Sequence, residues 1–376
     1  MRIAYIINSV EGGGAALPVP AIAQTLRKCG AEIAIFALTR RDGRALLAMT
    51  AAGLDVTVRN GGEKDHRAAL AWLDRSVGAF EPDILWTSLT RATLLGQLVG
   101  ARRRIPVVSW QHAAFLKPAN RLLLRAMRRL SALWVADSES VAAFSARALG
   151  IASERLVTWP IFAVDPAAPR ARPWQPGEAL RIASLGRLHP VKGYDVLIEA
   201  LARIKVNDPG HSMPFKVNIG GVGAEQARLQ AQIDAAGLSN VTLAGYIGDP
   251  RIFLAGQHLY IQPSRSEGFC VAAHEAIQAG LAVIGSAVGE MAHSIEDGRT
   301  GLLVPPGDPA ALAAALERCL ANPGMLQAMG ERGGDRLIER FSAARFEQTA
   351  ASIIQRLAGL CRPARPPGQP VNDRSA

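Results

Sequence analysis

Three groups of residues in this sequence have the types and spacing needed to bind a phosphorylated ligand. They are the glycines of residues 12–14, the basic pair Arg187 and Lys192, and the carboxylates Glu267 and Glu275, which have seven residues between them. Glycines let a backbone approach a ligand closely, arginine and lysine neutralise phosphate oxygens, and carboxylates accept hydrogen bonds from hydroxyl groups. Taken singly, each group also has an ordinary explanation, namely a tight turn, a solvated loop or solvated helix residues.

Short apolar runs that alternate with helical patterns must position these residues. Helical patterns lie, for example, at 15–28 and 67–79. The alternation is typical of a parallel, doubly wound α/β sheet, in which ligands bind at the carboxyl ends of the strands. The strands that we predict in the first half are 3–7, 33–38, 56–58, 84–86, 107–110, 133–136 and 156–158.

A proline-rich segment interrupts this alternation in the middle of the chain. It contains Pro166, Pro169, Pro173 and Pro176, which is typical of a linker between domains. The pattern then resumes, so we predict two doubly wound sheets in tandem. The predicted strands of the second sheet are 180–185, 215–219, 241–245, 259–262, 282–285 and 302–304.

Composition restricts the class of protein. Lys and Arg outnumber Asp and Glu by 42 to 32, a net charge of +10 that favours anionic partners such as nucleotides, nucleic acid or an acidic membrane surface. The arginine preference of a high-GC genome explains the same excess. The cysteines lack CxxC or metal-ligand spacing, which favours a reducing cytosol without structural disulfides; they are Cys29, Cys270, Cys319 and Cys361.

Other features exclude further classes. No apolar run reaches the ~20 residues of a membrane-spanning helix, and the first apolar run is too short for a signal peptide. Residues 11–14 (EGGG) are not a G-x-G-x-x-G motif, which counts against a nicotinamide cofactor. There is also no Asp-x-Asp motif and no His/Cys cluster. We therefore expect a cytoplasmic protein, soluble or peripheral on the inner face of the cytoplasmic membrane, without a metal or other cofactor.

The combined motifs resemble those of the family 4 (group 1) glycosyltransferases. The resemblance covers about residues 1–345 and includes the late run 297–308 (DGRTGLLVPPGD). It implies the α/β GT-B fold, in which two tandem Rossmann-like doubly wound domains face each other across a cleft. It also implies a retaining, metal-independent hexosyltransferase. Such an enzyme moves a sugar from a nucleotide-diphosphate donor to a glycan or lipid-linked acceptor, with cell-surface polysaccharide synthesis as the setting and no nucleic-acid partner.

The resemblance assigns phosphate-binding roles to four residues. Gly13 and Gly14 would approach the donor phosphates or the acceptor through backbone amides. Arg187 and Lys192 would neutralise the diphosphate leaving group, replacing the divalent cation that other transferases use.

Further residues would contact the ribose and the transferred sugar. Glu275 would hold the ribose hydroxyls, and Glu267 would lie beside the sugar. His112, at the end of a predicted strand, matches a family histidine near the sugar, although a lone histidine at a strand end is more often structural. The backbone amides around the sugar would be those of Gly268, Phe269 and Cys270.

The sequence departs from the family pattern at two places. The family usually has Gly-Gly-x-Pro-Glu where this chain has residues 289–293, so Glu290 replaces a glycine and His293 replaces the glutamate. The family Asn-Gly near Asp165 is absent, and residues 159–161 are Trp-Pro-Ile. Both changes affect expectations about the donor more than those about the fold.

We expect the following domain layout. The amino-terminal Rossmann-like domain takes the acceptor, the second takes the donor, and a carboxyl-terminal helix packs back on the first domain before a disordered tail. In order, the amino-terminal domain, linker, second domain, helix and tail are residues 1–165, 166–179, 180–341, 342–361 and 362–376.

A basic amphipathic segment lies at residues 117–130. Its apolar stripe contains Leu123, Met127 and Leu130. Such a helix binds an anionic membrane surface, or packs its apolar stripe into the core as an ordinary surface helix. The arginines that would face a membrane are Arg121, Arg125, Arg128 and Arg129.

Two other functions fit the same motifs. One is a nucleotide-sugar epimerase or hydrolase on the same fold, which would turn over donor without an acceptor. The other is a non-catalytic nucleotide-sugar-binding protein, which would bind donor without turnover.

Overall fold

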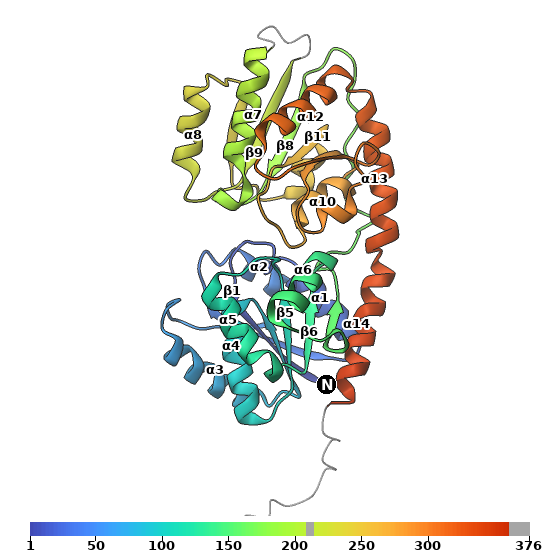
Figure 1. The fold of residues 1–376 in the computed structure, drawn as a ribbon. Coiled ribbons are helices and arrows are strands. Elements are labelled where there is room, and N and C mark those ends of the chain that lie inside the picture. The colour runs from blue at the N-terminus through green and yellow to red at the C-terminus, as the bar shows by residue number, and fades with distance from the viewer. Residues whose placement is uncertain (208–213, 361–376) are drawn as a thin grey trace, which may run out of the picture.

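The computed structural model describes residues 1–207 and 214–360. Two parallel sheets, each flanked by helices, lie one above the other in Figure 1. The α/β fold class predicted from the alternating pattern is therefore confirmed. The predicted tail at 362–376 lies outside the described residues.

The first sheet has seven strands in the order β3-β2-β1-β4-β5-β6-β7, and every pair is parallel. Each predicted apolar run of the first half forms one of these strands. Their bounds are β1 Arg2–Ser9, β2 Glu32–Thr39, β3 Asp55–Val58, β4 Ile84–Ser88, β5 Val107–Gln111, β6 Leu133–Ala136 and β7 Leu156–Thr158.

The first helix starts later than the sequence pattern predicts. We expected a helix over 15–28, but α1 begins at Val19, because Pro18 and Pro20 restrict the chain to the first turn of a helix. The helical segments of this domain are α1 Val19–Lys28, α2 Arg44–Ala51, α3 His66–Phe80, α4 Thr90–Arg103, α5 Pro118–Met127, η1 Arg128–Leu130, α6 Glu139–Phe144, η2 Ser145–Leu149 and η3 Ser153–Arg155.

The second sheet has six parallel strands in the order β10-β9-β8-β11-β12-β13. Their bounds are β8 Leu180–Leu185, β9 Phe215–Gly220, β10 Val241–Gly245, β11 Leu259–Gln262, β12 Ala282–Ser286 and β13 Leu302–Val304. The helical segments are η4 Pro190–Lys192, α7 Tyr194–Asn207, α8 Gln226–Ala235, α9 Pro250–Ala255, α10 Val271–Gln278, α11 Met291–Ser294, α12 Pro309–Ala321, α13 Met325–Phe341 and α14 Ala343–Ala358.

The last two helices connect the domains. In Figure 1, α13 and α14 run down one side of the molecule from the second sheet to the first. Phe346 of α14 packs on Trp159 with ring centroids 4.9 Å apart, and Trp159 stacks on Trp110 at 4.9 Å. Burial of large aromatic side chains is the main source of packing energy here, so α14 is part of the core of the first domain.

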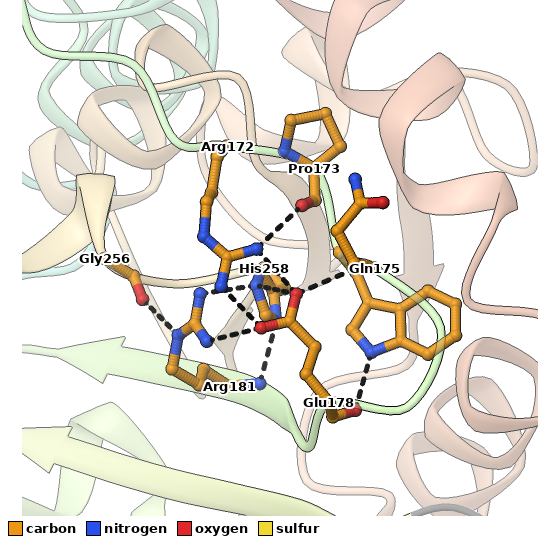
Figure 2. Close-up of polar contacts among 8 residues, drawn as sticks. Arg172, Pro173, Gln175, Glu178, Arg181, Gly256 and His258 are labelled. Atoms are coloured by element: carbon orange, nitrogen blue, oxygen red, sulfur yellow. Dashed lines mark hydrogen bonds and ion pairs between the residues drawn. The ribbon is translucent and has the colours of Figure 1, made fainter.

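Glu178 anchors the linker where it enters the second sheet (Figure 2). Its carboxylate accepts hydrogen bonds from Arg172 at 2.5 and 2.7 Å and from Arg181 at 3.0 Å. The Arg172 guanidinium holds the pKa of Glu178 well below its usual range. His258 lies 3.4 Å from the same carboxylate, but burial lowers its pKa to about 4, so its ring is neutral at pH 7.

None of the helices among the described residues combines the length and apolar composition needed to cross a membrane.

Candidate functional site

The second sheet reverses its strand order between β8 and β11. Loops that follow neighbouring strands at such a reversal leave in opposite directions and open a crevice, where ligands bind in α/β proteins. The loop after β8 carries Arg187 and Lys192, and the loop after β11 carries Glu267. The topology therefore brings two motifs that are 75 residues apart, from Lys192 to Glu267, to one edge of the sheet.

Lys192 and Glu267 form an ion pair at this edge. Lys192 Nζ lies 2.6 Å from Glu267 Oε1, and the two side chains are 20% and 10% exposed. Burial lowers the pKa of Lys192, but the facing carboxylate outweighs it and leaves the pKa raised overall. The ammonium therefore stays charged at neutral pH and fixes one oxygen of Glu267.

Gly193 allows the two loops to touch. It has φ +67°, and a Cβ atom there would lie 2.0 Å from the Pro263 carbonyl oxygen. A side chain at this position would push the loop of Glu267 away from Lys192.

Arg187 is exposed beside this pair. Its charge acts to lower the pKa of Lys192, so the two cations lie within electrostatic range of each other. Within the described part of the chain, Arg187 forms no ion pair. An unpaired guanidinium next to a fixed ammonium is a suitable site for a diphosphate.

Three consecutive amides follow Glu267. The Phe269 and Cys270 side chains are 2% and 7% exposed, and Phe269 packs on His274 with ring centroids 4.1 Å apart. These residues can thus offer a ligand their backbone but not their side chains. Among the described residues, the N–H groups of Gly268, Phe269 and Cys270 find no acceptor, and they precede α10, whose N-terminus favours an anion.

Glu275 lies one turn into α10 and is partly buried. No group in the described residues donates a hydrogen bond to its carboxylate. Burial raises the pKa of Glu275 to about 7, against the lowering effect of Arg251. Partial burial without protein donors disfavours the ionised carboxylate, and hydroxyl groups of a ligand would stabilise it.

His112, at the end of β5, is held on both sides of its ring. Nδ1 lies 2.9 and 3.0 Å from the Asp137 carboxylate oxygens, and Nε2 lies 2.7 Å from Ser88 Oγ. Since a carboxylate accepts, Nδ1 carries a hydrogen, and in the neutral ring Nε2 accepts from Ser88. The ring also stacks on Trp110 at 5.5 Å. A ligand hydroxyl would therefore have to replace Ser88 to reach Nε2.

The two domains meet where Glu267 and His112 approach each other. A Cβ atom on Gly268 would lie 2.1 Å from the His112 carbonyl oxygen, and Ser138 Oγ donates to the Gly268 carbonyl at 3.3 Å. Ser140 Oγ donates to the Gly289 carbonyl at 3.0 Å. Residues of the first domain thus hold the backbone that carries Glu267.

The glycine loop forms its hydrogen bonds within the first domain. Gly13 O accepts from Ala16 and Leu17 in a turn between β1 and α1, and a Cβ atom on Gly14 would meet no atom within 4 Å. In the described residues, no hydrogen bond joins Gly13 or Gly14 to the second domain. The phosphate-binding role of Gly13 and Gly14 thus stays a prediction.

Glu290 and His293, which depart from the family pattern, have specific partners. Glu290 is 1% exposed and forms an ion pair with Arg340 of α13, while His293 Nε2 lies 3.1 Å from Ser140 Oγ. Arg340 also lines a groove of about 760 Å³ between the domains and α14. Both replacements thus make contacts that connect separate parts of the fold.

Sequence reasoning missed Ser88, Asp137, Ser138 and Ser140. Each follows or ends a strand next to the one that carries His112: β4 ends at Ser88 and β6 ends just before Asp137. Because neighbouring parallel strands end at the same edge, their position after β4 and β6 was the available signal.

Two family models match the two halves of the chain. Residues 12–163 match the model described as Glycosyltransferase Family 4, and residues 170–336 match Glycosyl transferases group 1. The chain belongs to this family of glycosyltransferases. This membership confirms the resemblance on which the predicted roles were based.

Curated relatives match over part of their length. A D-inositol 3-phosphate glycosyltransferase of Geodermatophilus obscurus is 33% identical over 218 residues, which are 53% of this chain and 48% of the relative. The lipopolysaccharide core biosynthesis mannosyltransferase LpcC of Rhizobium leguminosarum bv. viciae is 31% identical over 189 residues, 49% of this chain and 53% of the relative. The chain thus spans about half the length of the curated relatives that it matches.

Solved structures share the fold. Anabaena HepE, solved in complex with UDP-glucose, superposes with a TM-score of 0.81 at 21% identity, covering 95% of this chain and 100% of HepE. The sucrose-phosphate synthase of Thermosynechococcus elongatus gives a TM-score of 0.77 at 19% identity, covering 96% and 99%. The two-domain GT-B fold is therefore confirmed.

Replacing Lys192 with Met should lower the free energy of unfolding by about 2 kcal/mol, because Glu267 would remain buried without its cation. Adding Glu267→Gln should restore most of this loss. Urea unfolding monitored by circular dichroism measures both values. The matched control is Lys28→Met, whose exposed ion pair with Glu347 should contribute less than ~0.5 kcal/mol. An equal loss in the two lysine variants would contradict the structural role of the pair.

Proposed function

We propose that this protein is a retaining, metal-independent glycosyltransferase. It would move a sugar from a nucleotide-diphosphate donor to a glycan or lipid-linked acceptor in cell-surface or exopolysaccharide synthesis. The observation that carries the proposal is the convergence of Arg187, the Lys192–Glu267 pair and three acceptor-free amides at the strand-order reversal of the second sheet. The family membership of both halves and the UDP and UDP-glucose named for HepE support the same donor class.

The site residues provide electrostatic stabilisation for such a transfer. Cleavage of the sugar–phosphate bond builds negative charge on the leaving diphosphate, and Arg187, Lys192 and the amides of residues 268–270 would stabilise it. Glu267 would accept from a sugar hydroxyl, with His112 nearby in the first domain. Glu275 would accept from the ribose hydroxyls, which supply the donors that it lacks.

The metal-independent mechanism depends on the side-chain cations of Arg187 and Lys192. Among the described residues, no group of three or more His, Cys, Asp or Glu side chains is arranged to hold a metal ion. In the proposed mechanism Arg187 and Lys192 neutralise the negative charge on the diphosphate, as a divalent metal ion does in other transferases. The retaining stereochemistry follows from the resemblance of the Glu267–Glu275 block to family 4 enzymes.

A donor screen tests the proposal against its two rivals. Thermal shifts with UDP, GDP, ADP and their sugars should identify the nucleotide, because a ligand at 100 times its Kd stabilises by about 2.7 kcal/mol. Transfer to an acceptor should then occur equally with and without excess EDTA. Donor turnover without acceptor would favour the epimerase or hydrolase, binding without turnover would favour the binding protein, and loss of transfer in EDTA would refute metal independence.

Arg187→Gln should lower kcat by roughly 10²–10³-fold, because the leaving diphosphate loses a preorganised cation. Since Arg187 is exposed, the free energy of unfolding should change by less than ~0.5 kcal/mol. Steady-state kinetics and urea unfolding measure the two effects. Arg203→Gln, on the surface of α7, is the matched control and should leave kcat unchanged. A normal kcat for Arg187→Gln would show that this residue does not act on the leaving group.

The affinity for a nucleotide-diphosphate sugar should rise roughly tenfold from pH 6 to pH 8. Glu275 has a pKa of about 7, and ribose hydroxyls would bind its ionised form, so a proton must leave when ligand binds. A sugar diphosphate does not itself titrate in this range. Isothermal titration calorimetry at several pH values measures the slope, which Glu275→Gln should abolish. The same slope in that variant would assign the proton to another group.

A membrane-bound acceptor is supported by the surface of α5. Leu124 is buried, but Leu122 and Leu123 are 70% and 48% exposed, and nearby Phe115 is 63% exposed. The apolar stripe that we expected therefore does not pack wholly into the core. Exposed apolar residues among arginines are typical of helices that lie in a membrane interface. We accordingly propose that the protein works at the inner face of the cytoplasmic membrane.

Replacing Arg121, Arg125, Arg128 and Arg129 with Gln should release the protein from anionic vesicles, since each contributes about 1 kcal/mol near such a surface. Use of a lipid-linked acceptor should fall, while use of a soluble analogue should not change. Co-sedimentation at low and high salt measures binding. Four exposed arginines of the second domain serve as the control set: Arg203, Arg228, Arg299 and Arg318. Failure of the unmodified protein to sediment at low salt would exclude membrane binding.

A further inference from the structure

A chain of buried hydrogen bonds leads from the end of β8 to Glu267. The Leu185 N–H donates to Tyr260 Oη at 3.2 Å, and Tyr260 Oη lies 2.6 Å from Gln262 Oε1. Gln262 Nε2 lies 2.8 Å from Ser264 Oγ, which lies 2.6 Å from Glu267 Oε1. The side chains of Tyr260, Gln262 and Ser264 are fully buried. This chain therefore runs across the crevice, from the strand before Arg187 to the loop of Glu267.

The direction of every bond in the chain follows from its last member. Glu267 is paired with Lys192 and can only accept, so Ser264 must give its single hydroxyl hydrogen to it. The Ser264 oxygen then accepts from the Gln262 amide nitrogen, which leaves the Gln262 carbonyl to accept from Tyr260. The Tyr260 hydroxyl lies 2.6 Å from this carbonyl oxygen and 3.2 Å from the Leu185 carbonyl oxygen, so its single hydrogen goes to the nearer Gln262. All hydrogens point toward the carboxylate, an arrangement in which successive bonds polarise and strengthen one another.

The chain also distinguishes the two oxygens of Glu267. Oε1 accepts from both Lys192 and Ser264 at 2.6 Å. In the part of the chain that the structure describes, no nitrogen or oxygen donates to Oε2, and the further donor to this carboxylate is the Cys270 thiol, a weak one. Rotation of the carboxylate would break two buried bonds and leave Ser264 without an acceptor, which is unfavourable. Oε2 is thus the oxygen that a ligand hydroxyl can reach.

We propose that Gln262, together with Tyr260 and Ser264, is a positioning residue for Glu267. It fixes which oxygen faces the transferred sugar by tying the other oxygen, Oε1, to the backbone of Leu185, the residue before the Gly186–Arg187 loop. The inference rests on the proposed glycosyltransferase function for the role of Glu267. The hydrogen-bond chain itself is a property of the fold and can be tested without activity.

Two substitutions of Gln262 test the positioning role through kinetics. Gln262→Met keeps the length of the side chain but removes both bonds, and kcat should fall roughly 10–100-fold because the carboxylate loses its alignment. The Kd for free nucleoside diphosphate should stay within about twofold, since Glu267 faces the sugar. The matched control is Gln257→Met: Gln257 is also buried in the second domain, and among the described residues its side chain donates to the Phe253 carbonyl alone.

Gln262→Glu tests the direction of the bonds. A neutral carboxyl accepts from Tyr260 and donates to Ser264 as the amide does, whereas an ionised one competes with Glu267 for the Ser264 hydrogen. Because burial raises a carboxyl pKa, the kcat of this variant relative to the unmodified enzyme should increase as the pH falls. The kcat of Gln262→Met relative to the unmodified enzyme should show no such increase. A relative kcat for Gln262→Glu that does not change with pH, or a normal kcat for Gln262→Met, would overturn the positioning role while leaving the transferase function intact.

A stability measurement covers the case in which the unmodified protein transfers no sugar from any donor. That result would refute the proposed function but not the hydrogen-bond chain. The Tm of Gln262→Met, Glu267→Gln and the double variant should then be compared. A connected chain predicts that the Tm of the double variant falls by less than the sum of the two single decreases, because the first change already removes hydrogen bonds that the second would remove. Additive losses would overturn the chain.

Discussion

The reversal of strand order between β8 and β11 is the constraint on which the rest of the site depends. Parallel strands must be joined by crossovers on the faces of the sheet, so loops on either side of the reversal separate and leave a crevice. The ion pair Lys192–Glu267 lies at this crevice, and each of the two loops contributes one of its members. The glycine at 193 permits the loops to touch, and the buried bonds from Leu185 to Glu267 keep them in register.

The first domain takes part in this site through backbone contact. Gly268 lies against the His112 carbonyl, and Ser138 donates to the Gly268 carbonyl, so any rotation of the domains changes the surroundings of Glu267. The helices α13 and α14 set the distance between the domains, because Phe346 is packed into the aromatic core of the first domain. In the proposed transfer, which needs reacting groups aligned to fractions of an ångström, the contact between Gly268 and His112 would supply part of that alignment.

The replacement of a family glycine by Glu290 shows how the fold accommodates a local change. Burying an unpaired carboxylate lowers the stability of the fold. Glu290 is paired with Arg340 of α13, which lies 50 residues later in the chain. The Glu290 N–H still donates to the Gly268 carbonyl at 2.9 Å. Glu290 thus contacts the Glu267 loop through its backbone and the helix that joins the domains through its side chain.

The sequence by itself determined the alternation of strands and helices, the two sheets, the loops that carry Arg187, Lys192 and Glu267, and the helix that carries Glu275. These features follow from apolar periodicity and glycine-containing turns, which are local properties. It misplaced the start of α1, where two prolines delay the helix. Only the tertiary structure decided the partners, which are Asp137 and Ser88 for His112 and Arg340 for Glu290. It also decided the hydrogen bonds through Tyr260 and Gln262, because the position of these residues in an apolar strand predicted only that they are buried. These pairs lie on different strands and helices, so their contacts depend on strand order and domain packing, which local patterns do not encode.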